Sequence, residues 1–223
     1  MSSHSHWIDI DASVRGKVKL AVFIADGLNC QPRNDALWDA IHQLVATYRE
    51  KYPEPSAARE ALRPARDLYR RIGIEPTKVR PSSEALLRRA IQGKPLYNIN
   101  SIVDTCNYCS LSFLLPIGLY DHQKIRGRVV ARLGQEGEAY PGIGKDIIHV
   151  AHRLTLVDEE GPFGNPSADS RRTAIDLHTT RILWVIYAPF EYPEDALRDH
   201  LHFSMEQLMR FHNGKIVGHQ IIC

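Results

Sequence analysis

The order in which helix-like and strand-like segments follow one another most constrains the fold of this chain. Segments rich in Val and Ile, typical of β-strands, cover residues 127–134, 145–161 and 181–189. Helical periodicity is clear before them, at 34–53, and after them, at 193–214. Because helices and strands do not alternate regularly, the sequence predicts an α+β fold with a central, mostly antiparallel or mixed sheet and helices before and after it.

Other segments fit around this frame. Residues 18–29 have the pattern of a buried strand and 215–223 that of a final strand, while 162–170 has the Gly, Pro, Asn and Ser content of a loop. Further helices are expected at 53–74, broken near Pro64, at 80–94 and at 100–116. At 223 residues, the chain is expected to form a single domain over 1–223.

Composition excludes several classes of protein. The apolar share is 43% and the charged share 24%, which is ordinary for a globular protein, and no apolar run is as long as a membrane span. The N-terminus has neither the basic start nor the long apolar stretch of a signal peptide, so we expect a cytoplasmic protein without membrane contact. Dinucleotide-binding and P-loop glycine patterns, the G-x-S-x-G elbow and H-E-x-x-H do not occur.

One close pair of cysteines, Cys106 and Cys109, has the spacing of half a zinc site or of a redox pair. Cys30 and Cys223 stand alone in the sequence, and neither the 149/152 nor the 200/202 histidine pair has a finger or ribbon spacing with Cys106. A redox pair usually opens a helix, whereas this one lies several residues after the expected cap. We therefore expect packing cysteines, no metal and no cofactor.

Charge is unevenly distributed along the chain. Net charge is +2, yet residues 59–94 hold ten Lys and Arg against four Asp and Glu, and 124–132 hold four basic residues and no acid. Such an imbalance is typical of a protein with one anionic partner, although a solvated helix face gives the same pattern.

Residues 100–116, "NSIVDTCNYCSLSFLLP", carry the most specific pattern. The spacing of Asn100, Asp104, Asn107 and Tyr108 resembles a helix of the B3/B4 domain of the bacterial phenylalanyl-tRNA synthetase β subunit. A proline and an aromatic-Asp pair follow, as in that family, and residues 169–188 resemble its second segment. The resemblance covers about 75–190, with 1–74 and 191–223 expected to pack on that core, and it suggests a free-standing member of the family.

In the synthetase this domain is an editing site, so the resemblance implies hydrolysis of mischarged aminoacyl-tRNA at its 3′ end. An apolar pocket rejects an added hydroxyl poorly, which is why a second, hydrolytic site is needed. Alternatives are a non-catalytic tRNA- or RNA-binding module with the same fold, and a small-molecule or amino-acid binder. Two departures from the family pattern favour the non-catalytic module. Gly118 stands where the family usually has His, and 169–172 reads Asp-Ser-Arg-Arg where the family has a Gly-Gly-Glu carboxylate.

Candidate site residues follow from these segments. Ester hydrolysis needs a positioned water and a stabilised oxyanion, for which we expect Asp169 and Asp104 as catalytic carboxylates. Substrate would bind between two polar walls. The helix provides Asn100, Asn107 and Tyr108, and the segment after Asp169 provides Arg172 and Thr173 on the opposite side. These groups could equally tie loops to the helix or form a salt-bridge network. Contacts to tRNA phosphates are expected from Arg70, Arg71, Lys78, Arg80, Arg88 and Arg89.

Overall fold

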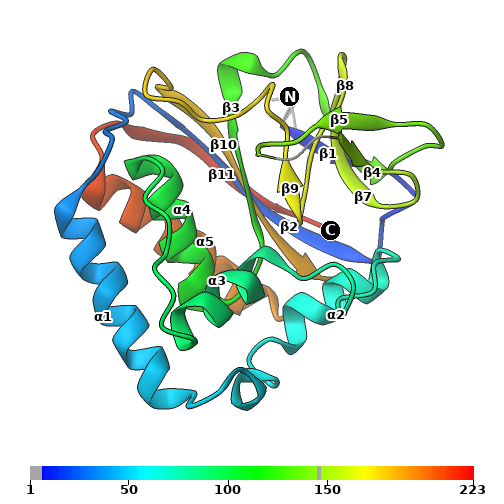
Figure 1. The fold of residues 1–223 in the computed structure, drawn as a ribbon. Helices are drawn as coiled ribbons and strands as arrows, with labels where there is room; N and C mark the ends of the chain where they lie inside the picture. The colour runs from blue at the N-terminus through cyan, green and yellow to red at the C-terminus, as the bar shows by residue number, and fades with distance from the viewer. Residues whose placement is uncertain (1–6, 145–146) are drawn as a thin grey trace.

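The structure, a computed structural model that describes residues 7–144 and 147–223, contains five α-helices and three β-sheets over these residues (Figure 1). The central sheet has the order β11-β2-β10-β3 and is antiparallel throughout. Its strands come from distant parts of the chain: β2 (Val18–Asp26), β3 (Ile117–Asp121), β10 (Arg181–Pro189) and β11 (Lys215–Ile222). Residues near both ends of the chain therefore share one sheet.

A second sheet, of five strands, has the order β1-β4-β7-β8-β9. Only its β1–β4 pair is parallel among the strands described. The strands are β1 (Ile8–Ile10), β4 (Val129–Leu133), β7 (Leu154–Asp158), β8 (Gly161–Asn165) and β9 (Ala168–Asp169). A small third sheet joins β5 (Ala139–Pro141) to β6 (Ile147–His149).

Four of the five helices lie on the side of the central sheet away from the five-stranded sheet, and one packs on the same side as that sheet (Figure 1). The helices are α1 (Asp35–Lys51), α2 (Arg63–Arg71), α3 (Ser82–Ile91), α4 (Ser101–Phe113) and α5 (Glu194–Phe211), with 3-10 turns at Pro55–Ala58 and His122–Lys124. Helices α4 and α5 cover the sheet, α1 and α3 pack on α4, and α2 packs against β10 at one end. None of the helices described is long and apolar enough to span a bilayer.

Both faces of the central sheet are buried along β2, β3 and β10, which explains the nearly continuous apolar sequences of β2 and β10. On β10, Leu183, Val185 and Tyr187 face the five-stranded sheet, whereas Trp184 and its neighbours on the other face pack against α4 and α5. Alternate residues of each strand point to opposite faces, so a strand between two cores must be apolar at every position.

The predicted α+β class, with helices before and after mostly antiparallel strands, is confirmed. One local prediction is wrong. Most of residues 162–170 form β8 and β9, because β8 pairs with β7 and β9 pairs with β8, and composition alone does not reveal this pairing. The strand-like pattern of 145–161 is confirmed by β6 and β7, which are separated by a turn in which His152 has a φ of 58°, whereas 145–146 lie outside the described residues.

Candidate functional site

The polar side chains at the start of α4 hold the helix in place. Asn100 is the N-cap, and its side chain accepts a hydrogen bond of 3.0 Å from the Val103 N–H. Asp104 is buried and accepts two bonds of 3.0 Å, one from the Ile99 N–H and one from the Trp38 indole on α1. Both residues therefore satisfy groups inside the protein, as the alternative of a structural tie predicted.

Asn107 and Tyr108 lie farther along the same helix. They line a crevice of about 10 Å³ between α4, α1 and the Leu96–Tyr97 segment, too small for more than about one water molecule. The Tyr108 ring packs against Phe203 and Phe211 on α5 or at its end. This stripe of α4 faces other helices rather than an open pocket.

Asp104 and Asp169 do not face each other as expected. Successive residues of an α-helix are rotated by about 100°, so Cys106 points away from Asp104, towards the central sheet. On α4, it is the Cys106 thiol whose pKa is raised in part by the charge of Asp169. Asp104 instead contacts α1, on the opposite side of the helix.

The Asp169 carboxyl lies at the edge of the central sheet, where β9 passes β3. Asp169 is partly exposed, and desolvation by the protein around its carboxyl raises its pKa from 3.8 to about 7. The Tyr120 hydroxyl and the Leu119 backbone N–H partly oppose the shift because both favour the charged form. A carboxyl whose pKa lies near 7 can accept or give a proton at neutral pH.

Two glycines make room for the tyrosine beside Asp169. A Cβ on Gly118 would lie 2.2 Å from the Tyr120 hydroxyl, and one on Gly164 would lie 2.4 Å from the same ring. The ring is fully buried, and its hydroxyl shares a hydrogen bond of 3.0 Å with Tyr187. Gly118, noted in the sequence as a departure from the family, is therefore required by the position of Tyr120.

Arg172 and Thr173 occupy structural positions near this edge. Arg172 makes a two-pronged ion pair with Asp158, at 2.8 and 2.9 Å, so it does not pair with Asp104. The Thr173 carbonyl accepts a bond of 2.8 Å from the Asp121 N–H and closes the outer edge of β3. The buried Thr173 hydroxyl has no hydrogen-bond partner in the described part of the chain.

Cys106 and Cys109 are buried in the core between α4 and the central sheet. Desolvation raises the pKa of both thiols, which keeps them protonated. No group of three His, Cys, Asp or Glu side chains that could hold a metal ion occurs within residues 7–144 and 147–223.

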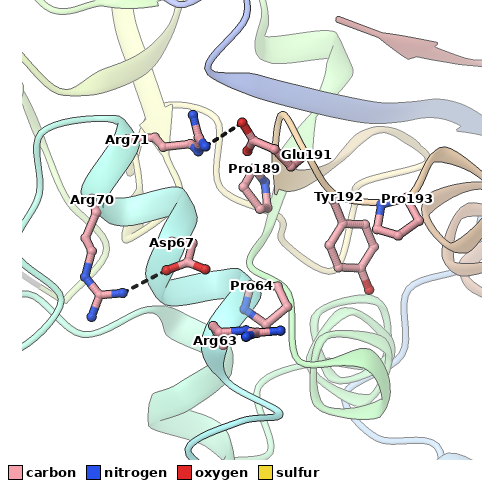
Figure 2. A pocket seen from close by; sticks show the side chains of 9 residues that line it. All are labelled: Arg63, Pro64, Asp67, Arg70, Arg71, Pro189, Glu191, Tyr192 and Pro193. Atoms are coloured by element: carbon pink, nitrogen blue, oxygen red, sulfur yellow. Dashed lines mark hydrogen bonds and ion pairs between the residues drawn. The ribbon is translucent and has the colours of Figure 1, made fainter.

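Arginines gather along α2 and the turns beside it. A cavity of about 610 Å³ lies between α2 and the Pro189–Pro193 turn, and Figure 2 shows Arg63, Arg70 and Arg71 at its wall. Arg70 pairs with Asp67 at 2.8 Å, and Arg71 with Glu191 across the cavity.

The remaining predicted tRNA contacts are arranged differently. Lys78 is exposed, and Arg80 lies 3.7 Å from the buried Glu84. Arg89 donates to the Pro95 carbonyl at 2.8 Å and stacks over the Tyr97 ring. The loop that follows α3 therefore already holds the Arg89 side chain. Arg88 lines a second cavity with Arg59 and Arg66, which sequence reasoning did not single out. Arg59 and Arg66 are spaced from Arg63 and Arg70 by three or four residues in the sequence. This helical spacing was the local signal that these arginines share one face.

Comparisons with known proteins give one family. The family described as the B3/4 domain matches residues 64–211. A phenylalanine–tRNA ligase β subunit of Bartonella henselae is 27% identical over 104 residues, 46% of this chain and 13% of that protein. The corresponding subunit of Wolbachia sp. subsp. Brugia malayi is 32% identical over 78 residues, 34% of this chain and 10% of that protein. The chain thus spans only about a tenth of the length of these relatives.

Among solved structures, an N-terminal fragment of the phenylalanyl-tRNA synthetase β-subunit from Pyrococcus horikoshii is similar, with a TM-score of 0.46 and 14% identity. The match covers 94% of this chain and 49% of that one.

Proposed function

This chain belongs to the B3/4 domain family, and from that premise we propose that it hydrolyses the ester bond of mischarged aminoacyl-tRNA. Support for the substrate class comes from the relatives, which are β subunits of phenylalanine–tRNA ligases. Such an ester joins an amino acid to a ribose oxygen at the 3′ end of the tRNA. The amino acid is left open, because Gly118 and the Asp-Ser-Arg-Arg sequence depart from the family pattern.

The observation that carries the proposal is the environment of Asp169. With a pKa of about 7, its carboxylate can take a proton from water as the water oxygen attacks the ester carbonyl. The carbon–oxygen ester bond then breaks, and the ribose oxygen leaves with a proton. Beside the carboxyl, the Tyr120 hydroxyl and the Leu119 N–H act as positioning groups. Asp104, which Trp38 and Ile99 already engage, has no part in this chemistry.

The test is single-turnover hydrolysis across a panel of mischarged tRNAs. Wild type should release the amino acid from at least one of them and spare the correctly charged tRNA. Asp169→Asn should lower the rate at saturation by about a hundredfold, while tRNA affinity stays within a few-fold. Asp195→Asn is the matched control, since Asp195 is an exposed aspartate in the first turn of α5.

A second candidate function is RNA binding without catalysis. It is favoured by the Tyr120 ring, which fills the space above Gly118 and Gly164 beside Asp169. If wild type binds tRNA but hydrolyses no member of the panel at any pH, this candidate replaces the first. If hydrolysis occurs and Asp169→Asn keeps the full rate, the reaction stands and the assignment of Asp169 is wrong.

A further inference from the structure

Three neighbouring cavities along α2 share lining residues, and we treat them together as one groove. The largest, of about 610 Å³, shares Arg63 and Arg70 with a cavity of about 220 Å³. That cavity in turn shares Arg59 and Arg66 with a third, of about 400 Å³. The groove therefore runs from the Pro189–Pro193 turn, along α2, to the Pro55–Ala58 turn and α3.

Six arginines line this groove, which we call the arginine groove: Arg59, Arg63, Arg66, Arg70, Arg71 and Arg88. Arg63, Arg66 and Arg70 recur at intervals of three and four, so they lie on one face of α2. Four carboxylates line it as well and reduce its net charge: Glu54, Glu60, Asp67 and Glu191.

The arginines differ in how firmly they are engaged. Arg66 makes a two-pronged bond to the buried Glu84, at 2.7 and 2.8 Å, which fixes α2 to α3. The Arg70–Asp67 and Arg71–Glu191 pairs are exposed, and exposed pairs contribute little stability, so an anion can replace the carboxylate. Arg59 and Arg88 have no carboxylate partner among the residues described, and both line the same cavity.

We propose that the arginine groove binds the ribose-phosphate backbone of single-stranded RNA, with Arg59 and Arg88 as its principal phosphate contacts. Three adjacent cavities extend farther than one phosphate group needs, and a positively charged groove that follows the backbone is typical of single-strand binding. Tyr192, beside Pro189 and Pro193 at one end (Figure 2), provides an aromatic surface for an unstacked base.

The groove and the Asp169 site share α2. On its inner side, the Tyr69 hydroxyl donates a bond of 2.8 Å to the Pro166 carbonyl, in the turn that leads into β9 and Asp169. RNA in the groove would thus lie on the outer side of the helix that supports this turn. The identification of the RNA as tRNA rests on the proposed function, whereas the phosphate contacts do not.

The test is binding of uncharged tRNA, and of a short unstructured RNA, to the full chain over a range of NaCl concentrations. Each phosphate contact to single strands contributes about 0.7 to the slope of log K against log [NaCl]. Arg59→Ala with Arg88→Ala should therefore reduce the slope by about 1.4 for both RNAs. The control, Arg198→Ala with Lys215→Ala, removes two positive charges from exposed positions on α5 and β11 and should leave the slope unchanged.

Four results would overturn the proposal. Three are no RNA binding by wild type, an unchanged slope in the groove variant, and an equal reduction in the control. The fourth is pyrophosphate that binds as tightly as RNA, which would favour a small phosphate compound. Arg59→Gln with Arg88→Gln, checked by thermal melting, separates lost contacts from lost folding. If the slope is reduced but wild type hydrolyses no tRNA, the groove binds RNA and the proposed reaction is rejected. If wild type hydrolyses tRNA but the slope is unchanged, the reaction is supported and the groove proposal is rejected.

Discussion

Tyr120 on β3 and Tyr187 on β10 share a hydrogen bond of 3.0 Å between their hydroxyl oxygens, inside the core between the two large sheets. The same Tyr120 hydroxyl stabilises the charged form of Asp169. One buried tyrosine thus connects the packing of the central sheet with the protonation of the candidate catalytic carboxyl.

Removal of this hydroxyl should change both properties. In Tyr120→Phe, Asp169 loses a donor that favours its charged form, so its pKa should rise and the pH above which hydrolysis is fast should rise with it. The Tyr187 hydroxyl is left without this partner, which should cost about 1 to 3 kcal/mol of stability. A pH–rate profile and denaturant melts measure the two effects. An unshifted profile would show that Tyr120 does not influence Asp169.

The pH dependence of stability should report the raised pKa of Asp169. Between about pH 4 and pH 7 the unfolded state ionises this carboxyl while the native state keeps its proton, so the native state binds more protons and its stability falls as pH rises. Asp169→Asn removes this effect. Relative to the variant, wild type should lose stability progressively from pH 4 to pH 7, by a few kcal/mol at most. Parallel pH series of urea melts would test this, and a constant difference would contradict the raised pKa.

Gly118 should tolerate no side chain while Tyr120 keeps its position. Gly118→Ala places a methyl group against the Tyr120 hydroxyl, and overpacking of this kind typically costs about 1 to 3 kcal/mol. Gly137→Ala is a control for substitution at glycine, with no atom near its added Cβ, although its φ of 80° carries a backbone penalty of its own. In Gly118→Ala with Tyr120→Leu, the second change should cost less than it does alone. Additive costs in a double-mutant cycle would show that the two residues do not conflict.

The Trp38–Asp104 bond should matter for stability and not for hydrolysis. Trp38→Phe leaves one buried carboxylate oxygen without its donor, which should cost about 1 to 3 kcal/mol. Asp104→Asn should also destabilise the protein, yet its single-turnover rate should remain within a few-fold of wild type below the melting temperature. A rate loss of a hundredfold in a folded Asp104→Asn variant would place Asp104 in the site after all.

The cysteines should differ in reactivity according to burial. Cys223 is exposed, whereas Cys106 and Cys109 are buried thiols with raised pKa values. Alkylation followed by mass spectrometry should label Cys223 first and the other two only on unfolding. We also expect no stoichiometric zinc in the purified protein, and hydrolysis near the wild-type rate after Cys106→Ala with Cys109→Ala. Fast labelling of the pair, or zinc lost in the double variant, would contradict this.

Local sequence was sufficient where a feature depends on neighbours in the chain. Asn34 and Asn100 cap α1 and α4, and such a cap can be found locally because it needs only the N–H groups of the next turn. The four polar positions on α4 share one helical stripe for the same reason. Apolar runs likewise identified β2 as a buried strand and β10 as a strand, since a strand between two cores has no polar face.

Tertiary structure decided what each of these features faces. Nothing local shows that the α4 stripe meets Trp38, or that Cys106 faces the sheet and Asp169, because those partners come from helices and strands distant in sequence. Residues 162–170 have a loop-like composition, yet β8 pairs with β7 and β9 pairs with β8, and this pairing places Asp169 beside the edge of β3. Its pKa follows from that burial, and desolvation is a property of the assembled fold rather than of any sequence segment.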